Sequence, residues 1–317
     1  MLKVGLIGVG GISNAHIPAW ESMENAELVA LCDVRPEQME DYKDTKRCYT
    51  NAMEMLDKEE LDIVDICLPT YLHAEYSIMA MERGINVLCE KPVSLSKSDI
   101  QRVYESAEKN NVFFMVAHVL RFWNEYEILY SLVKNNTYGK VLSGTMFRLS
   151  QFPGWSWEDW MKDEKRSGLV PFDLHIHDLD FLVYMFGEPK NVTNYRSKKP
   201  NQDYICATYD YGDFFINCES SWYAGGFPFS AGFRIQFEQA VVCFEKGELI
   251  AYPVEGEPVS LAQQSEVTEG VINLTDMGPY ANEISYFADC VLNGEEPNKV
   301  KPRELEIVIN LLDKFKQ

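Results

Sequence analysis

The first 118 residues alternate short apolar runs with amphipathic stretches. Five runs of aliphatic and β-branched residues have the length of buried parallel strands, at residues 2–7, 28–32, 63–68, 86–89 and 113–116. Between them, apolar positions recur with a helical period at residues 12–23, 51–58, 74–83 and 97–110. Gly84 follows the third of these stretches, where a glycine commonly ends a helix. This alternation predicts an α/β domain with a doubly wound parallel sheet.

After His118 the pattern changes to a helix followed by closely spaced β-rich segments. The helix is expected at residues 123–135, and the strands at residues 204–211, 214–222, 233–238, 241–245 and 248–252. Gly212 and Asp213 form a hairpin signal between the first two strands. Helical patterns at residues 279–292 and 303–315 end the chain. We therefore predict a first domain at residues 1–118 and an α+β domain with a largely antiparallel sheet at residues 119–317.

Composition narrows the classes of protein that fit this pattern. A length of 317 residues is long for one core, and an apolar fraction of 46% favours globular domains. The 29 Lys and Arg residues against 49 Asp and Glu residues give a net charge of −20, which would repel the phosphates of a nucleic acid. Eight cysteines without a CxxC pair favour buried, reduced thiols in a cytoplasmic protein. The strand pattern starts too early for a signal peptide, and no apolar run reaches the ~18 residues of a membrane span.

A glycine-rich loop separates the first strand from the first helix. It consists of Gly8, Val9, Gly10, Gly11, Ile12 and Ser13. Glycines there permit a tight turn and the close approach of a pyrophosphate to a helix N-terminus. Asp33, at the end of the second strand, can accept hydrogen bonds from a ribose and would repel a 2′-phosphate, while Arg35 after Val34 would soften that repulsion. The loop predicts a dinucleotide site, with NAD favoured over NADP.

Glu90, Lys91 and Pro92 follow the fourth predicted strand, at the edge of the sheet where open α/β folds bind ligands. Pro92 disfavours a helical conformation for Lys91, so the turn would direct the lysine into the crevice. The preceding strand ends at the same edge with Leu68, Pro69, Thr70 and His73. The alternatives are a surface Lys-Pro turn and, for His73, a simple helix cap.

The motifs GVGGIS, LPTYLH and CEKP, together with Asp33, resemble the glucose–fructose oxidoreductase/inositol dehydrogenase (Gfo/Idh/MocA) family. The resemblance covers nearly the whole chain, and the CEKP motif is its most specific part. It implies an N-terminal Rossmann domain that binds NAD and a C-terminal domain with an open antiparallel sheet. It also implies a homodimer or homotetramer formed through that sheet.

Residues 172–181 read FDLHIHDLDF and hold two of the five histidines and three aspartates. On a regular helix, Asp173, His177 and Asp180 share one face, whereas His175 points elsewhere. A metal site, a solvated helix face and an acid–base site are all compatible with this composition. No cysteine or HExxH motif supports a metal. We favour the acid–base interpretation because it joins the cluster to Lys91 and a nicotinamide.

Oxidation of an alcohol requires groups of these types. A histidine can accept the hydroxyl proton near neutral pH, a carboxylate can orient it, and a lysine ammonium can stabilise charge on the substrate oxygen. The family resemblance implies these roles for His177 as base, Asp173 as supporting acid and Lys91 as orienting cation. His175 stands where the family motif commonly has glycine, so its role is open between a catalytic group, a substrate contact and a spectator.

Further residues are expected to line the site. His118 and Arg121 begin the second domain, where they would face the cofactor and substrate, or else form a salt bridge at the domain junction. Trp155, Trp157 and Trp160 are expected either to pack as core or lid residues or to stack on a sugar. The predicted cofactor contacts are the loop residues Gly8, Gly10, Gly11, Ile12 and Ser13 with Asp33, Val34, Arg35, Leu68, Pro69, Thr70, His73, Glu90, Lys91, His118 and Arg121. The predicted substrate contacts are Lys91, His118, Trp157, Asp173, His175, His177 and Tyr280.

The sequence therefore predicts an NAD-dependent oxidoreductase that acts on a sugar, a polyol or an inositol-like alcohol. One alternative is an NAD-dependent glycosidase that cleaves by transient oxidation. Another is a nonenzymatic NAD-sensing regulator. Neither a metal nor a membrane or nucleic-acid partner is expected.

Overall fold

The computed structural model describes residues 1–262 and 278–316, which divide into two compact units. The first unit comprises residues 1–119 and 278–302, and the second comprises residues 120–262 and 303–316. Helix α8 (Gly278–Asn293) thus belongs to the first unit, where it packs against α1 (Ser13–Glu21). The predicted division into residues 1–118 and 119–317 does not include this second segment of the first unit.

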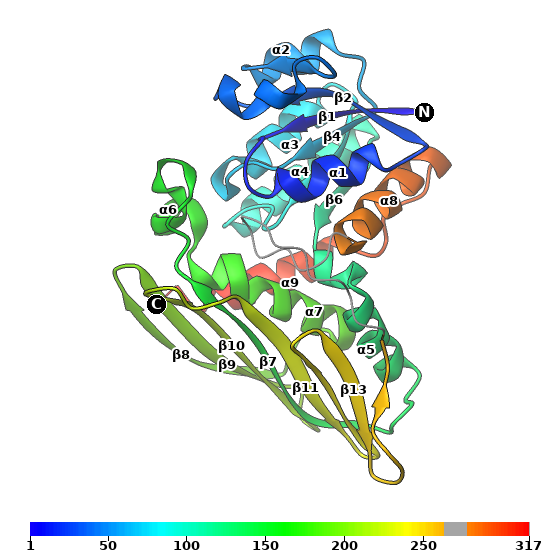
Figure 1. Ribbon diagram of the computed structural model, residues 1–317, viewed down its shortest axis with the longest axis vertical. Helices are drawn as coiled ribbons and strands as arrows, with labels where there is room; N and C mark the ends of the chain where they lie inside the picture. Colours follow the sequence, from blue (N-terminus) through cyan, green and yellow to red (C-terminus); the bar gives the residue numbers. More distant parts are fainter. Residues whose placement is uncertain (263–277, 317) are drawn as a thin grey trace. The chain divides into compact units, whose positions relative to one another are not determined.

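The first unit is built on a parallel sheet with the strand order β3-β2-β1-β4-β5-β6 (Figure 1). Its strands are β1 (Leu2–Ile7), β2 (Ala26–Cys32), β3 (Arg47–Tyr49), β4 (Ile63–Ile66), β5 (Asn86–Glu90) and β6 (Phe114–Ala117). Besides α1 and α8, its helices are α2 (Ala52–Lys58), α3 (His73–Met81) and α4 (Lys97–Asn110). The predicted doubly wound parallel sheet is confirmed. The three-residue strand β3 was not predicted, because so short a segment carries no periodic signal.

Strand β4 lies at the centre of this sheet and is buried along its whole length. Ile63, Val64 and Ile66 have no exposed surface, as expected for a strand covered by helices on both faces. Asp65, also fully buried, is the one charged residue in the strand. A buried carboxylate requires compensating partners, so Asp65 is not explained by packing in the core alone.

The second unit is built on an eight-stranded sheet with the order β14-β13-β12-β11-β7-β10-β9-β8. Its strands are β7 (Val141–Gln151), β8 (Asn191–Lys199), β9 (Gln202–Asp210), β10 (Phe215–Tyr223), β11 (Ser230–Phe237), β12 (Ala240–Glu245), β13 (Glu248–Pro253) and β14 (Val259–Ser260). Neighbouring strands are antiparallel, except for the parallel pair β7 and β10. The large, mostly antiparallel sheet predicted for this half is confirmed.

Three strands of this sheet, β7, β8 and β14, were not predicted. In β7 the inward side chains include Arg148, which is buried, and Gly144, so the apolar alternation that marks a strand is broken. In β8 the outward positions other than Tyr195 are polar, and the inward ones are only half-buried. Strands of this kind take their place from pairing with their neighbours rather than from their own pattern.

Helices α5 (Asn124–Lys134), α7 (Ile176–Phe186) and α9 (Pro302–Asp313) lie on one face of this sheet, and no helix among the described residues covers the other (Figure 1). The short helix α6 (Glu164–Ser167) follows the loop after β7. The uncovered face carries Tyr195, Phe215 and Tyr252, which are 81%, 45% and 46% exposed. The second unit therefore has one packed face and one face open to other molecules.

Two further expectations concern the whole chain. All eight cysteines are free thiols, in agreement with the reduced state predicted from their spacing. Among the described residues, no helix combines the length and apolar character that crossing a membrane demands.

Candidate functional site

The glycine loop has the local geometry that a dinucleotide site requires. Gly8 adopts a φ of +100°, and a Cβ on it would lie 2.6 Å from the carbonyl oxygen of Cys67, so only glycine fits there. A Cβ on Gly10 would meet nothing within 4 Å, so the loop faces open space at that point. Gly11 and Ile12 are half-exposed, and Ser13, the first residue of α1, is buried with its hydroxyl donating to the Gly10 carbonyl at 2.6 Å. The loop therefore leaves room for a phosphate at the start of a helix.

Asp33 lies at the end of β2 beside this loop and is 7% exposed. Its Oδ2 accepts a hydrogen bond of 2.9 Å from the Val9 amide, and its Oδ1 accepts one of 2.8 Å from the Arg35 amide. The Arg35 guanidinium also contacts this carboxylate, with Nε 3.2 Å from Oδ1, while Val34 between them is exposed. The loop, the aspartate and the arginine thus form one connected group at the carboxyl ends of β1 and β2.

The Glu90-Lys91-Pro92 turn ends β5 with Lys91 half-buried and Glu90 buried. The Lys91 amide donates to Oε2 of Glu90 at 3.1 Å, and the Lys91–Pro92 peptide is cis. His73, which is 1% exposed, has Nδ1 2.7 Å from the Pro92 oxygen and Nε2 2.6 Å from the Leu68 oxygen. His73 is therefore more than a helix cap, because it joins the EKP turn to the Leu68-Pro69-Thr70 segment. Burial lowers the pKa of its imidazole.

Two buried residues near this turn were missed by sequence reasoning. His16, on α1, has Nδ1 2.8 Å from Oδ2 of Asp65 and Nε2 3.1 Å from Oε1 of Glu90. An aspartate inside an apolar strand and a histidine on the buried face of a short helix were the signals available. Neither is informative alone, because the sequence does not show that the two face each other.

In the second unit, the predicted cluster does not lie on one regular helix. Pro171–His175 forms a π-helical turn, and α7 begins only at Ile176. Asp173 and His177 are half-buried and therefore retain access to small molecules. Asp180, which the helical spacing grouped with Asp173 and His177, is fully buried and does not share their accessibility. The common placement of Asp173 and His177 stays a prediction.

Asp178 and Asp180 instead form ion pairs with buried arginines. Asp178 Oδ1 accepts a 2.9 Å hydrogen bond from Arg148 on β7, and the same arginine nitrogen lies 3.2 Å from the Tyr126 hydroxyl. Asp180 Oδ1 accepts a 2.6 Å hydrogen bond from Arg121. These two buried ion pairs hold α7, the helix that carries His177, in place.

The structure argues against two predicted contacts. Arg121 is fully buried, pairs with Asp180 and Glu304 and lies over the Tyr184 ring at 4.6 Å, so it is occupied within the second unit rather than available to a cofactor. His175 is also fully buried, with Nδ1 3.0 Å from the Ser220 hydroxyl and Nε2 2.7 Å from the Tyr209 hydroxyl. Burial lowers the pKa of His175 to about 3. Of the three roles left open for His175, that of a spectator fits, because its neutral ring is part of the core.

The remaining predicted contacts differ in their accessibility. His118 is buried at the end of the first unit, and Tyr280 on α8 is buried with its ring 5.9 Å from that of His16. Trp157 is half-buried in the 3₁₀ segment Trp157–Lys162, whereas Trp155 before it is 54% exposed. Contacts of these residues with a substrate stay predictions.

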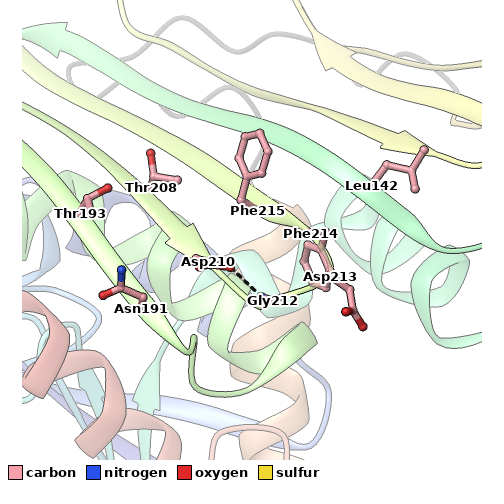
Figure 2. Close-up of a pocket in the computed structure, with 9 residues that line it drawn as sticks. All are labelled: Leu142, Asn191, Thr193, Thr208, Asp210, Gly212, Asp213, Phe214 and Phe215. Carbon is pink, nitrogen blue, oxygen red and sulfur yellow. Dashed lines mark hydrogen bonds between the residues drawn. The ribbon is translucent and has the colours of Figure 1, made fainter.

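A shallow cavity of about 380 Å³ opens on the uncovered face of the second sheet. Figure 2 shows its lining, which comes from β8, β9, β10, the hairpin after β9 and the start of β7. The lining residues are Leu142, Asn191, Thr193, Thr208, Asp210, Gly212, Asp213, Phe214 and Phe215. None of them is a predicted site residue, and Asp210 is engaged by the Gly212 amide at 2.7 Å. The cavity belongs to the open face of the sheet rather than to the candidate catalytic groups.

Comparisons with known proteins place these features in a family. Residues 2–118 match the model described as an oxidoreductase family with an NAD-binding Rossmann fold, and residues 126–250 match the GFO/IDH/MocA C-terminal domain. Glucose-6-phosphate 3-dehydrogenase of Bacillus subtilis is 30% identical over 68% of this chain and 64% of its own length. A 2,7-anhydro-N-acetylneuraminate hydratase of Mediterraneibacter gnavus is 31% identical over 59% of this chain and 50% of its own length.

The fold has a counterpart among solved structures. Levoglucosan dehydrogenase in complex with NADH and levoglucosan superposes with a TM-score of 0.83 at 19% identity, over 98% of this chain and 95% of that one. The parallel sheet, the glycine loop and Asp33 all lie in the region that matches the NAD-binding Rossmann fold. The chain belongs to the Gfo/Idh/MocA family of oxidoreductases.

Proposed function

We propose that this protein is an NAD-dependent dehydrogenase that oxidises a secondary alcohol of a sugar, a polyol or an inositol-like compound. The observation that carries this proposal is the joint presence of the glycine loop, the buried Asp33 and the half-buried Lys91 in one unit. The named activities of the dehydrogenases reported above support the substrate class.

The residues of the first unit fit a dinucleotide. The open space beside Gly10 and the start of α1 at Ser13 would receive a pyrophosphate. The Asp33 carboxylate would accept hydrogen bonds from a ribose. The bound nicotinamide would supply an acceptor for the hydride of the alcohol carbon. NAD is proposed over NADP because the buried Asp33 carboxylate would repel a 2′-phosphate.

The chain's own groups would handle the proton and the charge. His177 would accept the hydroxyl proton at a ring nitrogen, and the Asp173 carboxylate would favour the imidazolium that results. The Lys91 ammonium would bind the substrate oxygen and stabilise the negative charge that develops on it. All three side chains are half-buried, which leaves them accessible while limiting their hydration.

The direct test is a panel of sugars and polyols with NAD and NADP, monitored by the absorbance of the reduced cofactor. On the substrate found, Lys91→Met and His177→Asn should each lower kcat/KM by about 100-fold or more. The exposed Lys109 on α4 offers a matched control, because Lys109→Met changes the same charge away from the site. Unchanged turnover in the Lys91 and His177 variants would refute the assigned roles.

A second test concerns cofactor preference. Asp33→Asn should shift the ratio of the Kd values for NADPH and NADH towards NADPH by about tenfold, because it removes a negative charge while the amide oxygen can still accept a hydrogen bond. Fluorescence titration measures both constants without a substrate. Asp41→Asn, which changes an exposed acid shortly after Asp33 in the chain, is the control. An unchanged ratio would show that Asp33 does not set the preference.

A redox-neutral reaction is a second candidate function, because the hydratase relative shows that the family is not confined to named dehydrogenases. In this case the enzyme would oxidise its substrate, eliminate or cleave a bond and reduce the product again, so that NADH would not accumulate. Product formation measured by chromatography with catalytic NAD and a flat absorbance trace would favour this candidate, including a glycosidase reaction. Stoichiometric NADH would exclude it.

We also propose a homo-oligomer formed through the uncovered face of the second sheet. The exposed aromatic side chains of Tyr195, Phe215 and Tyr252 on this face support it, since single domains rarely expose several large apolar residues on one sheet face. Analytical ultracentrifugation of the wild type and a Tyr195→Lys variant tests the proposal. A monomeric wild type would contradict it.

A further inference from the structure

A chain of buried charged side chains runs from the first helix to the EKP turn. His16 on α1 and Asp65 on β4 are fully buried, and Glu90 at the end of β5 is 7% exposed. One ring nitrogen of His16 lies 2.8 Å from Asp65 and the other lies 3.1 Å from Glu90. Ionised carboxylates only accept hydrogen bonds, so a His16 imidazolium that donates from both nitrogens would satisfy both partners.

The electrostatic environment agrees with this arrangement. Burial alone would lower the pKa of His16, but the Asp65 carboxylate raises it well above its usual value. Burial would likewise raise the pKa of Glu90, but His16 and Lys91 bring it below its usual value. The charged forms are thus mutually stabilised in the interior.

Asp65 is itself held in position. The Trp20 indole donates to its Oδ2 at 2.7 Å, and the Cys67 thiol lies 3.6 Å from its Oδ1. The ligand atoms of His16, Asp65 and Cys67 are close enough for a metal ion, within 4.8 Å of one another. However, burial raises the pKa of Cys67 to about 12, so it remains a thiol, and both His16 nitrogens are already engaged. A hydrogen-bonded network accounts for the cluster better than a metal site.

The network ends on the backbone of the turn. The second Glu90 oxygen, Oε2, accepts the hydrogen bond of 3.1 Å from the Lys91 amide. On the other side of Lys91, the Pro92 carbonyl oxygen lies 2.7 Å from His73. The backbone on both sides of Lys91 is therefore attached to buried side chains, whereas the lysine side chain is half-exposed.

We propose that His16 is a positioning residue for Lys91: anchored by Asp65, it holds the Glu90 carboxylate, which in turn fixes the Lys91 backbone. This inference rests on the proposed function only for its effect on turnover. Its structural content, the attachment of Lys91 to His16 through Glu90, can be measured without a substrate. His16 does not act on the reacting atoms in this arrangement.

Hydrogen exchange of the NAD-bound protein, followed by mass spectrometry of peptides spanning residues 86–95, is the primary test. His16→Gln should make this segment exchange faster by about tenfold. Trp20→Phe is the matched control, because it removes another donor to Asp65 but leaves the contact between His16 and Glu90 intact. Unchanged exchange in His16→Gln would overturn the proposal whether or not the enzyme is active. If His16→Gln does not fold, Asp65→Asn should give the same acceleration, and its absence would be equally decisive.

Kinetics on the substrate from the panel give a second readout. His16→Gln should lower kcat by about 10- to 100-fold, since a small displacement of a catalytic group has a large cost, while the Kd for NADH changes by less than about threefold. In a Glu90→Gln background, the same substitution should lower kcat by less than about twofold further, because both act through one path. Additive losses would contradict a role through Glu90. If Lys91→Met leaves turnover intact while exchange in His16→Gln is accelerated, the proposed function fails and the attachment stands.

The charge state of His16 is open to direct observation in the wild type. Ring ¹⁵N spectra should show both nitrogens of one histidine still protonated at about pH 8, above the usual range for the side chain. The charged and titratable groups that face it are Asp65 from β4, Cys67 directly after β4, Glu90 from β5 and Tyr280 from α8. A neutral ring at that pH, or a stoichiometric bound metal lost in His16→Gln, would overturn the proposal.

Discussion

His16 and His175 are both fully buried, one in each unit, but their partners differ in charge. His16 lies between the carboxylates of Asp65 and Glu90. His175 lies between the hydroxyls of Ser220 and Tyr209, with the Phe315 ring at 5.4 Å in an edge-on orientation. The same side chain is thus used once as an internal cation and once as a neutral part of the core.

The comparison shows that burial alone does not determine the state of an interior histidine. Burial lowers the pKa of both rings, but only His16 has anions that overcome this effect. Hydroxyls can donate to one ring nitrogen and accept from the other, so they satisfy a neutral imidazole completely. The ionised network leads to a half-buried candidate catalytic residue, whereas the neutral one ends within the core.

The largest expected difference between the two sites is in stability at neutral pH. His16→Gln leaves two buried carboxylates without their cation, which should lower the free energy of unfolding by about 3–5 kcal/mol. His175→Gln removes a neutral hydrogen-bonding group, and we expect a loss of about 1–3 kcal/mol. Urea unfolding at pH 7 measures both. The double substitution His16→Gln with Glu90→Gln should recover part of the loss, because it removes one unpaired charge.

Equal losses for the two single substitutions would contradict the comparison, since they would imply that His16 carries no charge. Arg102→Met is a useful reference, because it breaks a surface ion pair with Asp99 in which the two side chains are 65% and 31% exposed. Such a pair should contribute no more than about 1 kcal/mol.

The sequence predicted the architecture of both units well where the pattern was periodic. Helix α4 begins and ends at the predicted residues, since its apolar positions Ile100, Val103 and Ala107 follow the helical spacing. Strands with a polar inward residue, such as β7 with Arg148, were not predicted. A single sequence does not show that Asp178, some thirty residues away, compensates that arginine.

The candidate site was predictable only in part, for the same reason. Lys91 and His177 could be singled out because strand ends and short motifs carry a signal in the sequence. Which residues of FDLHIHDLDF are buried and which are accessible could not be predicted, because the partners of the buried ones lie far away in the sequence. His16, Arg121 and His175 have roles that depend on partners distant in sequence, and for the two histidines the residue type alone does not indicate the charge state.

The dependence of stability on pH compares the two histidines most directly. His175 has a pKa near 3 in the folded state against 6.5 for the free side chain, so the unfolded state binds more protons between these values. Its contribution to stability is therefore lost as the pH falls below 6.5. His16 has a raised pKa, so its contribution is present below 6.5 and is lost as the pH rises through its folded-state pKa. The free energy of unfolding thus falls towards acid pH because of His175 (the acid limb) and towards alkaline pH because of His16 (the alkaline limb). The slope of each limb should approach roughly 1.4 kcal/mol per pH unit.

Urea unfolding between pH 4.5 and 9 resolves the two limbs, and the lower limit avoids the range in which Glu90, whose pKa is lowered from 4.5, loses its own contribution. His175→Gln should flatten the acid limb and leave the alkaline limb unchanged, whereas His16→Gln should flatten the alkaline limb. In the acid range His16→Gln also alters the contribution of Glu90, whose lowered pKa depends on His16. Difference curves between each variant and the wild type remove the contributions of groups that do not contact the substituted histidine. If both substitutions flattened the same limb, the two rings would share one charge state, and the assignment of His16 as an internal cation would have to be abandoned.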